Sequence, residues 1–150
     1  MSWTARLAEL GLELPPVATP AGAYVPAVRT GSLVFTAGQV PLVNGSPAAV
    51  GKLGAEIDVG LGRQLARTCA LNALAAVDGL VGLDLVVRVV KVVGFVASAP
   101  GFVAQPAVLN GASELLGELF GDAGAHARSA VGVAELPLGV PVEVELIVAV

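Results

Sequence analysis

Three stretches of the chain carry apolar residues at the spacing of an amphipathic helix. They cover residues 3–10, 58–79 and 109–120. The second begins at Asp58, a residue type that caps helices, and its apolar positions recur every four residues at Leu61, Leu65, Cys69 and Ala73. The pattern predicts a short leader helix and two main helices, the first of which ends near Gly79.

Five other stretches are rich in β-branched and aromatic residues, which is typical of strands. They cover residues 24–30, 33–40, 86–97, 128–135 and 141–150. The first two flank the turn-like pair Gly31-Ser32 and predict a β-hairpin. Glycine, proline and asparagine dominate the connections, and we expect a long loop at 41–57 and shorter ones at 121–126 and 136–140. The order ββ, α, β, α, ββ predicts an α+β fold.

Two of the predicted strands carry charged residues inside apolar runs. In residues 86–97, Arg88 and Lys91 fall on opposite faces of an ideal strand, and the remaining apolar positions predict a central strand covered on both sides. In residues 141–150, Glu143 and Glu145 share one face while the other face is apolar. Either glutamate is a candidate site residue, and a solvated strand face explains the pair equally well.

Composition adds an expectation about assembly. Hydrophobic residues make up 55% of the 150 residues and charged residues only 13%, which is too little polar surface for an ordinary monomer of this size. The length fits one domain over residues 1–150, with residues 1–20 as leader helix and loop. We therefore expect a single domain that buries apolar surface against other subunits.

A membrane span and an export signal are both disfavoured by charged residues. The most apolar stretch, residues 80–99, contains Asp84, Arg88 and Lys91, which a spanning helix would bury at considerable cost. The amino terminus lacks the apolar core of a signal peptide. We expect a soluble, cytoplasmic protein.

Several kinds of site are excluded by residue type. The net charge is −4 and the eight basic residues are scattered, which argues against a nucleic-acid surface. One histidine and one cysteine cannot build a usual zinc site, and no phosphate-binding or dinucleotide motif is present, so we predict neither metal nor cofactor. We interpret Cys69 as a core residue and His126 as a loop histidine.

Arg128 is the most informative residue that remains. It opens a predicted strand after a glycine-rich loop, and no acidic residue lies within five positions of it. Such an arginine can present its planar fork to a carboxylate ligand. A surface or ion-paired arginine is the alternative.

Three separated blocks of the sequence resemble the Rid (YjgF-type) reactive-intermediate deaminases. They are Ala23-Tyr24-Val25-Pro26-Ala27-Val28, the run from Gly31 through Ala37-Gly38-Gln39 to Pro41, and Ala127-Arg128-Ser129-Ala130-Val131-Gly132 continuing through Val142-Glu143-Val144-Glu145. The resemblance extends from about residue 24 to 150. It implies a chorismate-mutase-like α+β fold with a mixed β-sheet, two main helices on one face, and a homotrimeric barrel with ligand clefts between subunits.

The same resemblance implies a reaction and a set of site residues. Members hydrolyse an enamine or imine such as 2-aminoacrylate to a 2-oxo acid and ammonia, without metal or cofactor. By this resemblance Arg128 holds the substrate carboxylate, Glu143 orients or activates water, and Tyr24 lines the cleft. Backbone groups near Gly38 and Ala130 complete it, together with a helix residue that corresponds to Asn110 or to Ser113.

The chain also departs from the family pattern. The usual serine before the Gly-Gln pair is Ala37, the common cysteine two after the arginine is Ala130, and the glutamate that follows is Gly132. These changes keep open a non-catalytic trimer that binds small carboxylates or a partner. A ribonuclease, a label that some relatives carry, has little support from one loop histidine and an acidic chain.

Overall fold

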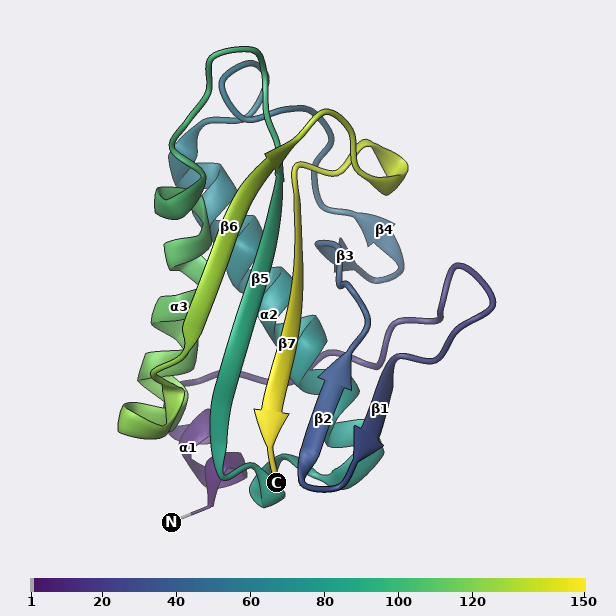
Figure 1. Ribbon diagram of the computed structural model, residues 1–150, viewed down its shortest axis with the longest axis vertical. Coiled ribbons are helices and arrows are strands. Elements are labelled where there is room, and N and C mark those ends of the chain that lie inside the picture. The colour runs from purple at the N-terminus through teal and green to yellow at the C-terminus, as the bar shows by residue number, and fades with distance from the viewer. Residues whose placement is uncertain (1) are drawn as a thin grey trace.

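The computed structural model describes residues 2–150, and a five-stranded mixed sheet is its largest element (Figure 1). The strands lie in the order β1-β2-β7-β5-β6. Only β5 and β6 are parallel, and the other neighbouring pairs are antiparallel. The bounds are β1 Ala27–Thr30, β2 Leu33–Thr36, β5 Arg88–Ala97, β6 Ala127–Val133 and β7 Val142–Ala149.

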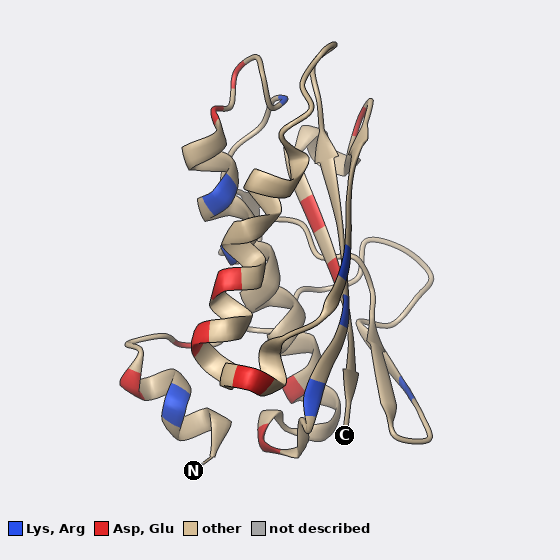
Figure 2. Cartoon of the chain, turned by 60° about the vertical axis from the view of Figure 1, so that its left-hand side comes forward, with Lys and Arg blue, Asp and Glu red and all other residues tan. Residues whose placement is uncertain are grey.

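Two long helices, α2 (Val59–Val81) and α3 (Gln105–Phe120), cover one face of this sheet (Figures 1 and 2). Asp58 caps α2 as predicted, because its Oδ1 accepts a hydrogen bond of 2.8 Å from the Leu61 amide. The helices approach closely at Gly111, where a Cβ would overlap the Arg63 carbonyl. The core between helices and sheet is built mainly from Leu, Val and Ala, including Leu65, Leu74, Val92, Leu109, Leu115 and Leu146.

A short leader helix, α1 (Trp3–Glu9), docks on the end of α3. The Trp3 indole nitrogen donates to the Val86 carbonyl at 2.7 Å, and its ring meets Phe120 edge to face with centroids 5.0 Å apart. The chain then crosses to β1 in an extended loop (Figure 1). The predicted leader helix and loop are confirmed.

The amino-terminal hairpin is shorter than predicted. Tyr24 lies in a bend before β1, and β2 ends at Thr36, whose hydroxyl accepts from the Leu146 amide at 3.0 Å in place of the main chain. The predicted long loop at 41–57 also contains a small two-stranded sheet of β3 (Leu42–Val43) and β4 (Ser46–Pro47), which was not predicted. Three-residue 3-10 turns at Leu83–Leu85 and Pro137–Gly139 and a four-residue one at Gly121–Gly124 occupy connections.

The prediction that Arg88 and Lys91 lie on opposite faces is wrong. Arg88 is opposite Ala149 and Lys91 is opposite Ile147, two positions of the same face, because a β-bulge at Val90 inserts one extra residue. Val89 and Val90 between the two charges are both apolar and fit either face of a strand, so the sequence does not say which of them is inserted.

The second face of the sheet is not covered by this chain, contrary to the expectation for residues 86–97. We call it the open sheet face, and its apolar members are Val28, Phe35, Val93, Phe95, Val131 and Ile147. Val28 is 53% exposed and Phe35 40%. Within residues 2–150, no helix is long and apolar enough to cross a membrane.

Candidate functional site

Arg128 lies near the start of β6 with its side chain on the helix-covered face of the sheet. Its Nη1 donates to Asn110 Oδ1 at 2.9 Å and to Ser113 Oγ at 3.1 Å, and its Nη2 donates to the Pro106 carbonyl at 3.3 Å. No carboxylate lies within ion-pairing distance of Arg128 in residues 2–150. The guanidinium is therefore oriented by neutral acceptors that leave its charge uncompensated.

Two hydrogens of the Arg128 fork are left without a partner in the described chain. They are the Nε hydrogen and one Nη2 hydrogen, because the three contacts use both Nη1 hydrogens and one from Nη2. The Nε hydrogen points away from the Nη1 contacts and has no acceptor in residues 2–150. A carboxylate ligand can accept a hydrogen bond on this side of the guanidinium.

Asn110 and Ser113, the two alternatives for the helix residue of the cleft, both contact Arg128. The two residues are three apart on α3 and so share a helix face. Both accept a hydrogen bond from the same Arg128 nitrogen. Sequence reasoning treated them as alternatives, although their spacing already placed them side by side.

His126 is a residue of this neighbourhood that sequence reasoning missed. Its Nδ1 is 2.6 Å from the Gly124 carbonyl oxygen and its Nε2 is 2.9 Å from Ser113 Oγ. His126 and Arg128 are two apart at a strand entrance, which is the spacing of one strand face. We call Pro106, Asn110, Ser113, His126 and Arg128 the Arg128 cluster.

Tyr24, Gly38 and Glu143 form a second group. They line a cavity of about 370 Å³ together with residues of the leader loop and the turn before β7. A Cβ on Gly38 would lie 2.9 Å from Glu143 Cδ, so the glycine makes room for the carboxylate. Mutual backbone bonds of 2.8 and 2.9 Å between Gln39 and Val144 fix the glycine segment beside β7. We call this space the Glu143 cavity.

The Glu143 carboxyl is the perturbed acid of the site. Partial burial raises its pKa above the ordinary value, and the neighbouring Glu145 carboxylate raises it further. A carboxyl that holds its proton closer to neutral pH is suited to general acid and base chemistry. Burial also raises the pKa of the nearby Cys69 thiol well above its usual range, which agrees with its prediction as a core residue.

The Arg128 cluster and the Glu143 cavity lie on opposite faces of the sheet. Arg128 is opposite Val92 of β5, and Glu143 is opposite Phe95 of the same strand. Val92 and Phe95 are three apart on one strand, so their side chains point to different faces. One chain alone does not bring the predicted carboxylate clamp and the predicted acid together.

The positions that depart from the family pattern have clear surroundings. Ala130 lies on the same face as Arg128 and packs against the core. Gly132 leaves space for the Gln105 amide, since a Cβ there would be 2.7 Å from Gln105 Nε2. That amide donates to Ser98 Oγ at 3.2 Å and to the Phe102 carbonyl at 2.9 Å.

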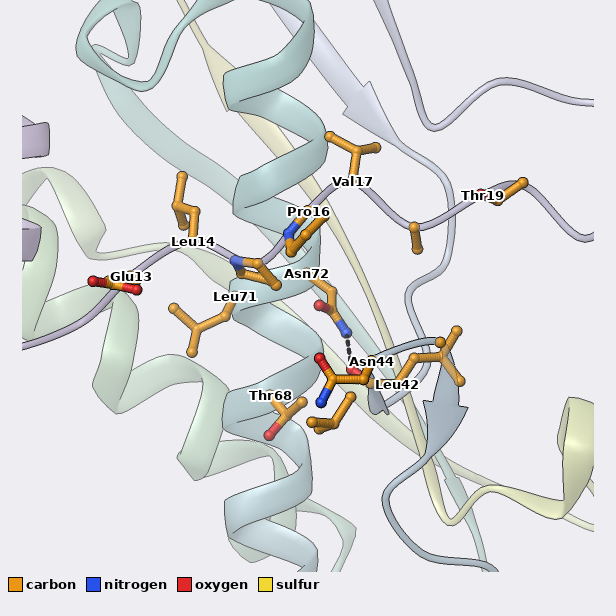
Figure 3. Close-up of a pocket in the computed structure, with 14 residues that line it drawn as sticks. Glu13, Leu14, Pro16, Val17, Thr19, Leu42, Asn44, Thr68, Leu71 and Asn72 are labelled. Atoms are coloured by element: carbon orange, nitrogen blue, oxygen red, sulfur yellow. Dashed lines mark hydrogen bonds between the residues drawn. The ribbon is translucent and has the colours of Figure 1, made fainter.

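A larger cavity of about 820 Å³ lies between the leader loop, α2 and the β3-β4 turn (Figure 3). Its walls include Pro16, Leu71 and Asn72, whose amide nitrogen donates to the Val40 and Leu42 carbonyls at 3.0 and 3.3 Å. None of the residues predicted to bind substrate lines it. Residues 2–150 contain no group of three or more His, Cys, Asp or Glu side chains placed to hold a metal.

Comparisons with known proteins agree with the fold and with these blocks. Residues 4–149 match the family described as "YjgF/chorismate_mutase-like, putative endoribonuclease". Protein TCP17 of Trypanosoma cruzi is 44% identical over 146 residues, which cover 96% of this chain and 91% of that protein.

Two solved structures extend the comparison. The protein Atu1372 from Agrobacterium tumefaciens, of unknown function, is 42% identical with a TM-score of 0.90, covering 99% of this chain and 93% of that one. E. coli TdcF with bound serine is 29% identical with a TM-score of 0.62, covering 89% and 93%. The chain belongs to the YjgF family, and its mixed sheet with two main helices on one face is the predicted chorismate-mutase-like α+β fold.

Proposed function

We propose that this protein hydrolyses small enamines or imines that carry a carboxylate, such as 2-aminoacrylate, to a 2-oxo acid and ammonia. The observation that carries the proposal is the Arg128 fork, which neutral groups orient and no carboxylate of residues 2–150 neutralises. The binding of serine in TdcF supports a small ligand of the amino-acid type. Family membership is compatible with small-molecule binding of the Rid kind and with an endoribonuclease-like function.

The reaction needs few groups because an imine carbon is already electrophilic. The enamine takes a proton at its terminal carbon to give the imine, and water then adds to the imine carbon. A proton moves to the nitrogen of this adduct, the C–N bond breaks, and ammonia departs. The hydroxyl group loses its proton and becomes the carbonyl of the 2-oxo acid. In this proposal Glu143, whose pKa is raised, orients the water and exchanges these protons, and Tyr24, which lines the same cavity, shapes it.

We further propose that each site forms between two subunits of a homotrimer. Arg128, Asn110 and Ser113 would come from one subunit, with Ala130 beside them, and Tyr24, Gly38 and Glu143 from its neighbour. Two features support this assembly: the two groups lie on opposite faces of one sheet, and the open sheet face exposes apolar side chains. Burying that face would remove apolar area from water.

The first experiment measures ammonia release from enzymatically generated 2-aminoacrylate. Wild-type protein should accelerate it, and Arg128→Ala should abolish the acceleration. Arg67→Ala is the matched control, because it also removes an arginine, one that pairs with Glu118 on the outer surface at 3.0 Å. Equal rates with and without wild-type protein would reject a deaminase.

The second experiment tests the shared site. Arg128→Ala and Glu143→Gln should each be inactive, and mixing the two after dissociation and reassembly should restore part of the activity. Mixed trimers contain some clefts with Arg128 from one subunit and Glu143 from the other. If the two residues act within one chain, mixing restores nothing.

A non-catalytic carboxylate-binding protein is the second candidate. It is favoured by Ala37, Ala130 and Gly132, which replace polar residues of the family pattern. Binding of pyruvate that depends on Arg128, without turnover of the imine, would support it. RNA cleavage that survives extensive purification and is lost in a cleft variant would instead support a ribonuclease, although Lys and Arg are scattered over the chain (Figure 2).

A further inference from the structure

We propose that His126 is a positioning residue for the carboxylate clamp, acting on Arg128 through Ser113. The proposal rests on the proposed function and extends it to a residue outside the family blocks. His126 is the only histidine of the chain and lies two residues before Arg128.

The direction of each hydrogen bond follows from which atoms can only accept. A carbonyl oxygen has no hydrogen, so the 2.6 Å contact with Gly124 requires a hydrogen on His126 Nδ1. In the neutral imidazole Nε2 is then bare, and at 2.9 Å it accepts from the Ser113 hydroxyl. The Ser113 hydroxyl hydrogen therefore points at His126 Nε2.

The hydrogen bond to His126 fixes the orientation of the Ser113 hydroxyl group relative to Arg128. With its hydrogen pointed at His126, Ser113 Oγ presents lone pairs to Arg128 Nη1 at 3.1 Å. Asn110 Oδ1 takes the other Nη1 hydrogen at 2.9 Å. The chain of contacts orients the guanidinium without a negative charge, so the ligand carboxylate does not compete with a protein carboxylate for it.

The Gly124 carbonyl, which accepts the hydrogen bond from His126 Nδ1, lies in a closely packed turn. Gly124 is buried in the 3-10 turn Gly121–Gly124, and a Cβ there would overlap the Leu116 carbonyl of α3. The turn therefore packs directly on α3, the helix that carries Ser113 and Asn110. Histidine, serine and arginine are held by one helix and the strand entrance beside it.

Three substitutions of His126 separate a positioning role from mere space filling. Gln carries an amide oxygen near the place of Nε2 and can accept from Ser113. Asn can donate near the place of Nδ1 but does not reach Ser113, and Leu does neither. We expect His126→Leu and His126→Asn to raise KM for the generated imine, and Kd for pyruvate, about three- to tenfold, the value of one neutral hydrogen bond. We expect kcat within about twofold of wild type, because the clamp binds substrate and transition state alike.

His126→Gln should restore KM to within about twofold of wild type. Ser113→Ala should raise KM as His126→Leu does, and the double variant should be no worse than either single one, because the two residues act in series. Wild-type affinity in His126→Leu, or a loss confined to kcat, would overturn the proposal. Unfolding midpoints measured for every variant identify a loss caused by misfolding.

An NMR measurement tests the role of His126 without depending on turnover. Because the chain has one histidine, its imidazole ¹⁵N signals need no assignment among several residues. With the imidazole neutral, wild type should show the Nδ1-protonated tautomer, and Ser113→Ala should move the Nε2 signal. An Nε2-protonated tautomer in the wild type would overturn the proposal. If the wild type shows the expected tautomer but neither binds pyruvate nor turns over imine, the His126–Ser113–Arg128 contacts are supported and the proposed function is rejected.

Discussion

The two faces of the sheet differ in what covers them. On the helix-covered face, Val92 and Leu146 are sealed under α2 and α3, and Arg128 reaches the edge of the same layer. On the open sheet face, Phe35 and Val131 remain 40% and 45% exposed beside the half-buried Glu143. One face is covered by helices of the same chain, and the other is not covered by residues 2–150.

This difference separates residues that hold the fold from residues available for assembly and chemistry. The helix-covered face is tightly packed, to the point that Gly94 has no room for a Cβ against Leu109. The open sheet face combines apolar side chains with the carboxylates Glu143 and Glu145. We therefore expect substitutions on the helix-covered face to lower stability and substitutions on the open sheet face to weaken self-association.

The largest expected effect is on the helix-covered face. Leu115 is fully buried on α3, and Leu115→Ala should lower the free energy of unfolding by about 2–5 kcal/mol through lost burial and the cavity left behind. Denaturant unfolding at one protein concentration measures it. Val131→Ala, on the open sheet face, is the control and should cost well under half as much in dilute protein; equal costs would remove the distinction between the faces.

The next effect is on assembly. Phe35→Asp places a charge in the middle of the open sheet face and should weaken self-association by at least about tenfold, because an unpaired charge is costly to bury. Sedimentation velocity over a range of concentrations measures it. Val103→Asp is the control, since Val103 is 81% exposed and lies in the loop before α3. A Phe35→Asp protein that assembles like Val103→Asp would contradict the proposed interface.

The elements of this fold could be predicted because local pattern decides them. The alternation of residues 142–149 and the four-residue spacing after Asp58 each point to one structure. The bulge at Val90 was missed because Val89 and Val90 fit either face of a strand, and an unbroken alternation places Arg88 and Lys91 on opposite faces. Tyr24 was predicted to lie in a strand because aromatic residues are enriched in strands, although they also occur in bends.

The candidate site was predictable only in part. Arg128, Glu143 and Tyr24 came from sequence blocks, whereas their division between two faces depends on the pairing of both strands with β5. The Ser113 and His126 contact joins α3 to the entrance of β6, and no local pattern encodes it. The spacing of His126 from Arg128 was the one available signal.

A smaller effect should appear in the Glu143 cavity. Gly38→Ala places a methyl group 2.9 Å from Glu143 Cδ, and the flexible carboxylate must move away. We expect kcat/KM for imine hydrolysis to fall about tenfold, because the proposed mechanism depends on the position of this carboxylate, with less than about 1 kcal/mol lost in stability. Gly117→Ala, where a Cβ meets nothing within 4 Å, is the control and should keep activity while gaining helix stability.

The smallest effect is on the pH dependence of stability. Burial, and then Glu145, raise the Glu143 pKa above its ordinary value of 4.5, so the folded chain binds this proton more tightly than the unfolded chain does. Stability should therefore fall as pH rises from about 4.5 through the raised pKa. Glu143→Gln should remove that fall and Glu145→Gln should reduce it, as measured by denaturant midpoints across this range. Assembly that buries Glu143 further would make the fall steeper in wild type than in the dissociated Phe35→Asp protein, and equal slopes in the two would argue that Glu143 stays outside the interface.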